Sequence, residues 1–399
     1  MVETAYWFLW FFVFVLPWQN VVQITGVGTI SRLAGIVAFV VGLFAVLSTG
    51  RLRRPTVFHF WAICFVAWSG LTVFWTLDPR ATAVRFSGNL QLMALVWLVW
   101  ELSQTSERRM GLFQAYVLGA YVSGTMIIVK FILGDPLVGR GQYERYAASG
   151  FQPNDVAFLM VLAIPMAWHL GTSCGQPFVR WMNRLYLPVG LLAILLTASR
   201  SGLLMTGLAL LIVPWTLSRL SLGTRIAMVI ILVASVVGAT RYTPAASLAR
   251  LATTRTELAQ GTLNTRRPVW RAGIKLFPRQ PVGGVGAGAF PSAVVPFLGF
   301  RKTPHNSYLS VLIEQGVVGL TFFLLMFISV FLHVRSAPPR ERRFFLVLLL
   351  TLVLGLTPRA WSEEKQTWLI LALLLAPAAS VQPAVPTVRR VPVRLAVSA

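Results

Sequence analysis

The sequence contains few acidic residues and almost no cysteine. Only 12 of its 399 residues are Asp or Glu, against 35 Lys or Arg. The two cysteines, Cys64 and Cys174, lie in an apolar run and in a short loop, so no disulfide framework is implied. The acids form no Asp-x-Asp pair, and no His or Cys cluster has metal-ligand spacing. We therefore expect no metal site and no cofactor.

Charged residues of both signs are scarce as well. They make up 12% of the chain, against about 25% in soluble domains, whereas hydrophobic residues make up 56% and the mean hydropathy is +0.71. This composition predicts an all-α, polytopic integral membrane protein. Apolar runs long enough to cross a bilayer predict about twelve transmembrane helices, near residues 5–18, 32–49, 57–77, 84–102, 111–133, 154–170, 185–198, 202–218, 225–241, 305–333, 344–357 and 366–380.

The net charge of +23 could indicate a nucleic-acid-binding protein, but most basic residues lie in short loops between the apolar runs. Cytoplasmic loops of membrane proteins are enriched in Lys and Arg, so the charge indicates topology and no nucleic-acid partner. With the N-terminus inside, sixteen basic residues lie in inward segments and eight in short outward loops. We expect both termini in the cytoplasm and membrane lipids around the bundle. The run from Ala5 to Trp18 has no cleavage site after it, which indicates a first span rather than a removable signal.

The chain is expected to have four parts: spans 1 to 9 (residues 1–241), a large periplasmic loop (242–304), spans 10 to 12 (305–380) and a cytoplasmic tail (381–399). The loop carries nine basic residues against one acid, Glu257, an excess that topology does not explain. From Pro268 onward the pattern predicts an amphipathic helix lying on the membrane, with an apolar face of Trp270, Ile274 and Phe277 and a basic face of Arg267, Arg271 and Lys275. The alternative is an anchor whose cations only meet lipid phosphates. Residues 283–288, rich in glycine, predict a flexible turn rather than a dinucleotide site.

His305 is the candidate for proton transfer. Pro304 disfavours helical geometry before it, and Asn306 is a plausible N-cap, so His305 is expected just outside the first turn of the tenth span. The positive end of the helix dipole and nearby arginines should keep its imidazole neutral, as a general base requires. The alternative is an interface histidine that only hydrogen-bonds backbone. Glu314 lies about half a turn round and roughly 13 Å deeper, so we expect it to satisfy a polar neighbour instead.

Arg200 lies in a short turn between two apolar runs, between Ser199 and Ser201. It must either extend to the membrane interface or face a polar cavity. The guanidinium group binds phosphate oxygens in a bidentate manner. Together with arginines of the large loop it could hold a pyrophosphate without a metal, and these arginines are Arg266, Arg267 and Arg271.

Several segments together resemble the O-antigen ligase and O-antigen polymerase family of bacterial envelope proteins. They occur in the same order over residues 140–370. They are Ser149-Gly150-Phe151-Gln152-Pro153-Asn154-Asp155, Thr197-Ala198-Ser199-Arg200-Ser201-Gly202, Arg266 to Trp270 leading to Pro281-Val282-Gly283-Gly284-Val285-Gly286, and His305-Asn306-Ser307-Tyr308-Leu309 with Glu314 and Gly316.

The resemblance implies an inverting, metal-independent glycosyltransferase of the bacterial inner membrane. Its donor would be a glycan on undecaprenyl pyrophosphate, and its acceptor a hydroxyl on the periplasmic side. Applied to this sequence, the resemblance implies that Arg200 and Arg266 bind the pyrophosphate and that His305 activates the acceptor. Because Arg266 and Arg267 are adjacent, it does not decide which of the two occupies the matching position. Asn306, Tyr308 and Glu314 are expected to support the site.

Ligation of O-antigen to lipid A core is the reading we favour within this family. Polymerisation of O-antigen or exopolysaccharide uses the same donor chemistry and a glycan acceptor. Twelve spans with inward termini would also suit a transporter of lipid-linked oligosaccharides, although the sequence shows no clear pair of broken helices. A scaffold in an envelope-assembly complex is the remaining alternative.

Overall fold

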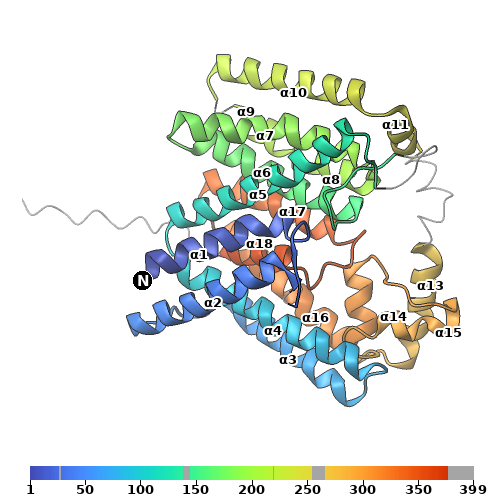
Figure 1. Cartoon of the computed structure of the whole chain (residues 1–399). Coiled ribbons are helices and arrows are strands. Elements are labelled where there is room, and N and C mark those ends of the chain that lie inside the picture. The colour runs from blue at the N-terminus through green and yellow to red at the C-terminus, as the bar shows by residue number, and fades with distance from the viewer. Residues whose placement is uncertain (27, 138–143, 219, 254–265, 376–399) are drawn as a thin grey trace, which may run out of the picture.

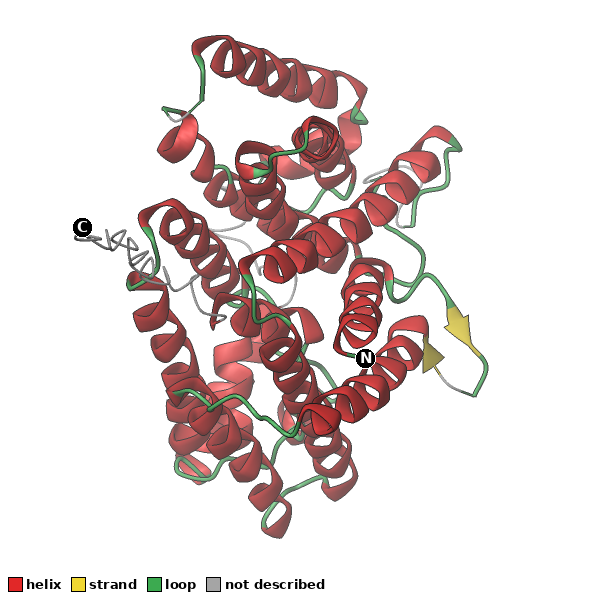
Figure 2. Ribbon diagram, turned by 90° about the vertical axis from the view of Figure 1, so that its left-hand side faces the viewer, coloured by secondary structure: helices red, strands yellow, loops and turns green. Residues whose placement is uncertain are grey.

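The computed structural model describes residues 1–26, 28–137, 144–218, 220–253 and 266–375. Within these residues the chain is a bundle of α-helices with one two-stranded hairpin, β1 (Gln23–Ile24) and β2 (Gly28–Thr29), at its edge (Figure 1, Figure 2). The helices of the bundle are α1 (Val2–Val15), α2 (Ile30–Thr49), α3 (Val57–Leu71), α4 (Pro79–Leu102), α5 (Ser106–Ile132), α6 (Pro153–Ser173), α7 (Pro177–Leu196), α8 (Arg200–Ala209), α9 (Ile212–Leu217), α10 (Leu222–Tyr242), α16 (Ser307–Arg335), α17 (Pro339–Gly355) and α18 (Lys365–Leu375). Short 3-10 turns extend α1 (Leu16–Trp18) and α3 (Thr72–Phe74).

The prediction of a polytopic all-α membrane protein is confirmed. Each of the twelve predicted spans falls on a helix, and the span expected at 202–218 consists of two helices, α8 and α9. In the part of the chain that the structure describes, nine helices are long and apolar enough to cross a membrane, and Val2–Trp18 and Lys365–Leu375 are shorter apolar helices. The expected end of the last span, at 376–380, and the tail at 381–399 lie outside the described residues.

Helix α6 is at the centre of the bundle, and most of its side chains are buried. It packs against α5, α7, α8 and α17. Helix α10 lies at the edge of the bundle, along α7 (Figure 1). Because α6 begins at Pro153, the residues just before and just after this proline lie at one end of the bundle core.

The segment between α10 and α16 contains short helices in its described parts. They are α11 (Ala245–Ala252), α13 (Arg266–Leu276), the 3-10 turn η3 (Phe277–Arg279), α14 (Phe290–Ala293) and α15 (Val295–Leu298). Figure 1 shows α13, α14 and α15 together at one end of the bundle, which we call the cavity end. Residues 254–265, with Glu257, lie outside the described residues.

The predicted amphipathic helix is present as α13, and the stripe that it buries against protein differs from the predicted apolar face. The buried residues are Val269, Ala272, Gly273 and Leu276, whereas Ile274 is 60% exposed. These buried residues pack against Phe290 and Val294, after the glycine-rich stretch, and Ile313 of α16. The helix therefore covers protein with one apolar stripe, and the stripe that contains Ile274 points away from this core.

Helix α16 is interrupted at Gly316, whose φ of 66° and ψ of −167° are not helical. The interruption frees backbone carbonyls, and the glycine-rich stretch binds them: Val285 N donates to Ile313 O, and Gly286 N donates to Glu314 O, each at 2.9 Å. A Cβ on Gly284 would lie 2.4 Å from the carbonyl carbon of Glu314. The stretch predicted to be a flexible turn is thus docked on α16, and glycine is needed for that close approach.

Candidate active site

A cavity of about 580 Å³ opens at the cavity end, between α13, the loops before α6 and α16, and the loop after α17. Its lining contains five cationic side chains and a single carboxylate. These residues are Arg145, Arg250, Arg266, Lys302, Arg359 and Asp155, and His305 lies among them. Such an excess of positive charge in a confined space favours an anionic ligand.

His305 lies directly before α16, as predicted. Asn306 caps that helix, because its side-chain oxygen accepts a hydrogen bond from Leu309 N at 3.0 Å. The backbone of His305 has a φ of +47°, a left-handed conformation that is strained for a residue with a Cβ. Its Nε2 is 3.3 Å from Thr303 Oγ1. The turn therefore directs the ring away from the helix and into the cavity wall.

The His305 side chain keeps an exposed edge, but the surrounding protein atoms of the cavity desolvate its ring, which lowers its pKa. The nearby Arg266 guanidinium lowers this pKa further, while Asp155 acts in the opposite direction. The sequence had suggested the helix dipole and the arginines as the causes. Desolvation, the larger cause, depends on the tertiary fold. Both effects favour a neutral imidazole near pH 7.

Arg266 is the first residue of α13 and lines the cavity beside His305. Burial lowers the pKa of its guanidinium, and Asp155 opposes that effect. Helix α13 is tied to the histidine turn by a hydrogen bond from Trp270 Nε1 to Pro304 O, at 2.7 Å. One short helix thus sets the position of Arg266 relative to His305.

Arg359, in the loop between α17 and α18, was not selected from the sequence as a site residue. Its side chain is only 2% exposed, and its Nη1 is 3.3 Å from Asp155 Oδ1. Nη2 donates to Ser201 Oγ at 3.3 Å, and the guanidinium lies 4.8 Å from the centre of the Phe158 ring. Its Nε is buried without a hydrogen-bond partner among the described residues. Burial lowers the pKa of Arg359 to about 10, with Asp155 opposing.

Hydrogen bonds join the loop that carries Arg359 to the start of α16. Ser307 N donates to Leu356 O at 3.0 Å, and Ser307 Oγ donates to Arg359 O at 2.7 Å. Trp361 N donates to the same Ser307 hydroxyl at 2.8 Å. Ser307 therefore holds Arg359 next to the histidine, although 54 residues separate them in the chain.

Arg145 and Arg250 also line the cavity. Arg145 donates from Nε to Thr197 O at 3.0 Å and from Nη2 to Asn154 Oδ1 at 2.7 Å. Burial, followed by repulsion from Arg250 and Arg200, lowers the pKa of Arg145 to about 10. Arg250 Nε donates to Ala198 O at 3.2 Å, in the turn that precedes α8.

Arg200 contacts the segment that carries Arg250 and does not line the cavity. It donates from Nε to Arg250 O at 3.0 Å and from Nη2 to Thr253 Oγ1 at 2.6 Å. Of the other arginines expected at a pyrophosphate, neither Arg267 nor Arg271 lines the cavity. Arg271 is exposed, because five residues after Arg266 the helix has turned by about 140° from it.

The three expected supporting residues have structural contacts. Asn306 is the N-cap described above, and Tyr308 donates its hydroxyl to Val353 O at 2.8 Å. Glu314 is 2% exposed and accepts a hydrogen bond from Gly288 N at 2.9 Å. The expectation that Glu314 satisfies a polar neighbour is confirmed.

The charged cavity residues that sequence reasoning did not select as site residues are Arg145, Asp155, Arg250, Lys302 and Arg359. One signal was available, since Arg145 and Arg359 belong to the eight basic residues counted in short outward loops. Nothing in the sequence indicated that these loops meet.

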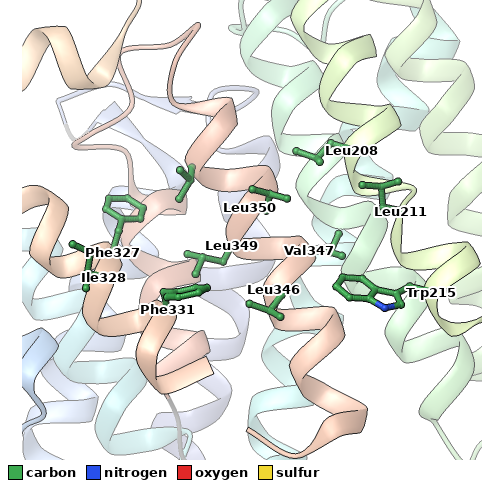
Figure 3. A pocket seen from close by; sticks show the side chains of 11 residues that line it. Leu208, Leu211, Trp215, Phe327, Ile328, Phe331, Leu346, Val347, Leu349 and Leu350 are labelled. Atoms are coloured by element: carbon green, nitrogen blue, oxygen red, sulfur yellow. The ribbon is translucent and has the colours of Figure 1, made fainter. Parts of the chain in front are cut away.

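A second, wholly apolar pocket of about 460 Å³ lies between α8–α9, α16 and α17 (Figure 3). Figure 3 shows Leu346, Val347, Leu349 and Leu350 of α17 between Phe327 and Phe331 of α16 on one side and Leu208, Leu211 and Trp215 on the other. Leu208 is eight residues after Arg200, roughly 12 Å along the helix axis. The pocket therefore lies farther along these helices, away from the cavity end, and several of its lining residues, such as Leu211 and Leu350, are exposed.

Comparison with known proteins supports the resemblance that the motifs suggested. Residues 185–324 match a protein-family model described as O-antigen ligase. No curated protein matches the chain. The matched range runs from α7 into α16, so it includes Arg200, Arg266 and His305, whereas Arg145, Asp155 and Arg359 lie outside it. The match covers about a third of the chain, and that part is similar to the O-antigen ligase family.

Proposed function

We propose that this chain, which carries an O-antigen ligase domain over residues 185–324, transfers a glycan from undecaprenyl pyrophosphate to lipid A core on the periplasmic face of the inner membrane. The observation that carries the proposal is the cavity itself. It combines a histidine whose pKa is lowered with five cations and one carboxylate. A neutral base and an anion-binding wall are the two elements that such a transfer needs.

In the proposed reaction, His305 takes the proton from an acceptor hydroxyl as its oxygen attacks the anomeric carbon. The bond between that carbon and the pyrophosphate oxygen breaks on the opposite side, so the configuration inverts. The leaving lipid pyrophosphate gains negative charge, which Arg266, Arg359 and Arg145 stabilise. His305 ends the step protonated, and Asp155 and solvent offset the added charge.

Arg200 acts differently in this proposal from the role carried over by resemblance. Its contacts with Arg250 and Thr253 support a positioning role, in which it holds the Arg250 side of the cavity. Contact between Arg200 and pyrophosphate would require α11 to move. Removing Arg200 should therefore weaken donor binding less than removing Arg266.

The apolar pocket of Figure 3 supports a lipid-linked donor. A donor whose pyrophosphate lies in the cavity must place its polyprenyl chain in the bilayer or against apolar side chains. The pocket between α8–α9, α16 and α17 provides such a surface on the helices that frame the cavity. Burial of apolar chain there would contribute about 25 cal/mol per Å² removed from water.

The test is a transfer assay with purified protein, lipid-linked glycan and defined acceptors. We expect His305→Ala to lower kcat by about 10²- to 10⁴-fold, the usual contribution of a general base. His333→Ala, at the other end of α16, is the matched control and should keep full activity. A His305→Ala protein with wild-type turnover would refute the base assignment.

The acceptor is tested separately with wild-type protein. Lipid A core and a second lipid-linked repeat unit are supplied in parallel reactions with the same donor. Transfer only to lipid A core supports ligation, and chain extension of the repeat unit supports polymerisation. Redistribution of donor across vesicles without product would favour a transporter.

A further inference from the structure

A groove with a charged end lies apart from the cationic cavity. Two of its lining residues, Glu363 and Lys365, follow Arg359 in the chain. The groove runs between α2 and α4, with Phe12 of α1 contributing to its wall, and has a volume of about 490 Å³. Most of its lining is apolar, including Ile36, Phe39 and Leu95, while Arg32 and Lys365 lie at one end. We call it the α2–α4 groove. It shares no lining residue with the cationic cavity.

The groove is wedge-shaped because α2 and α4 touch at one end and separate at the other. A Cβ on Gly42 would lie 2.4 Å from Leu98 Cδ2, so the two helices are in close contact there. Nearer the start of α4, a Cβ on Gly88 would meet nothing within 4 Å. The open end therefore coincides with the first turn of α2, where Arg32 lies, and with the third turn of α4, which contains Gly88.

Lys365 is held inward at this end rather than extended into solvent. Its Nζ donates to Gln19 Oε1 and to Ser31 Oγ, both at 3.0 Å. Both acceptors are neutral, and among the described residues no carboxylate forms an ion pair with Lys365. An ammonium group has three donors, so one is left for a ligand in the groove.

The acid that lines the groove does not cancel this charge. Glu363 forms an ion pair with Arg85, a third basic residue at the same end. Glu364 also interacts electrostatically with Lys365 and Arg85. Arg32, Arg85 and Lys365 still outnumber the two carboxylates, Glu363 and Glu364. Removing a cation from water costs free energy unless an anion compensates its charge. The apolar walls of the groove keep water from one side of these cations.

We propose that the α2–α4 groove binds an anionic phospholipid. Its phosphate contacts Lys365 and Arg32, and one acyl chain lies between α2 and α4. The apolar body of the groove favours a lipid over a free anion, and the two cations favour an anionic headgroup over a zwitterionic one. This site does not depend on the proposed glycan transfer.

The experiment measures lipid binding to the full-length, delipidated protein by native mass spectrometry, with phosphatidylglycerol and phosphatidylcholine of matched chains. We expect preferential binding of phosphatidylglycerol. Lys365→Gln and Arg32→Gln should each weaken it about fivefold, the effect of one basic residue at a membrane surface. Arg54→Gln, an exposed cation near the other end of α2, is the matched control.

Two further variants separate a specific site from loss of folding. Lys365→Arg should restore phosphatidylglycerol binding, and Gly88→Leu should reduce it without removing charge, because its side chain would fill the groove. Melting temperature is recorded for each variant. His305→Ala should bind phosphatidylglycerol like wild type, so failure of the transfer proposal would not affect this result.

Equal binding of the two phospholipids by wild-type protein would overturn the proposal. So would unchanged phosphatidylglycerol binding in the Lys365→Gln, Arg32→Gln double variant. Full competition by inorganic phosphate, with no effect of Gly88→Leu, would show an anion site instead of a lipid site.

Discussion

Replacing Arg359 with Met tests whether a residue outside the matched family range binds the anionic ligand. Arg359 lines the cavity, is only 2% exposed and has one buried N–H without a partner among the described residues. Met keeps much of the apolar length of the side chain and removes its charge and all of its donors. We therefore expect weaker donor binding in a protein that still folds.

The expected loss follows from the contacts. A hydrogen bond to a charged group contributes about 1.5–3 kcal/mol, which corresponds to a roughly 10- to 150-fold increase in donor Kd. The folded variant also lacks the ion pair with Asp155 and the cation–π contact with Phe158. The cation–π contact contributes about 0.5–2 kcal/mol to stability. Because the Asp155 side chain is 39% exposed, water can hydrate it. We therefore expect the free energy of unfolding to fall by about 3 kcal/mol, which is the lower end of the range for breaking a buried ion pair.

Donor affinity and melting temperature are measured together at fixed ionic strength. Arg301→Met is the matched control, because Arg301 is 70% exposed and also pairs with an aspartate, Asp78. Arg359→Lys should give an intermediate Kd, since it keeps the charge and loses the planar fork. A folded Arg359→Met protein with wild-type Kd would refute the reasoning. So would an equal loss in Arg301→Met, which would indicate long-range charge only.

Three further predictions concern the base, the apolar pocket and the glycine-rich stretch. Because the pKa of His305 is lowered and the neutral form is active, kcat/KM should persist below about pH 6.5 and fall as pH drops through the lowered pKa. Arg266→Gln removes one cause of that shift, so the acid limb should move to higher pH, and an unmoved limb would contradict the pairing. Leu350→Trp should impair transfer from a long-chain donor and spare a short-chain one, with Leu354→Trp, outside the pocket, as control. Equal effects on both donors would exclude a chain site. Gly286→Ala should destabilise by about 1–3 kcal/mol, because its Cβ would overlap Thr76 and its φ is +107°. Gly207→Ala, with open space around it, should melt like wild type.

Helix positions were predictable because the bilayer leaves the backbone little choice. In lipid, a spanning segment must satisfy its own hydrogen bonds, so length and hydropathy alone place α2 to α10 and α16. The interruption of α16 at Gly316 was not predictable in the same way. It depends on Pro281, Val285 and Gly286, more than 25 residues earlier, which supply partners for the freed backbone groups.

The face of α13 shows a related limit. Two apolar stripes occur on this helix, one containing Val269, Ala272 and Leu276 and the other containing Trp270 and Ile274. Periodicity identifies an amphipathic helix but cannot rank two adjacent stripes. Packing against Phe290 decides which stripe is buried.

The sequence by itself determined that this protein spans a membrane, that it carries unexplained cations near one histidine, and that its motifs resemble lipid-linked glycan transferases. Those properties reside in composition, charge count and local spacing. Only the tertiary structure decided which cations share a cavity with His305. Arg145 and Arg359 come from two separate loops and Arg250 from helix α11, and Ser307, Ala198 and Asn154 bring them together through hydrogen bonds. Such contacts join residues with no fixed separation along the chain, so no local pattern in the sequence records them.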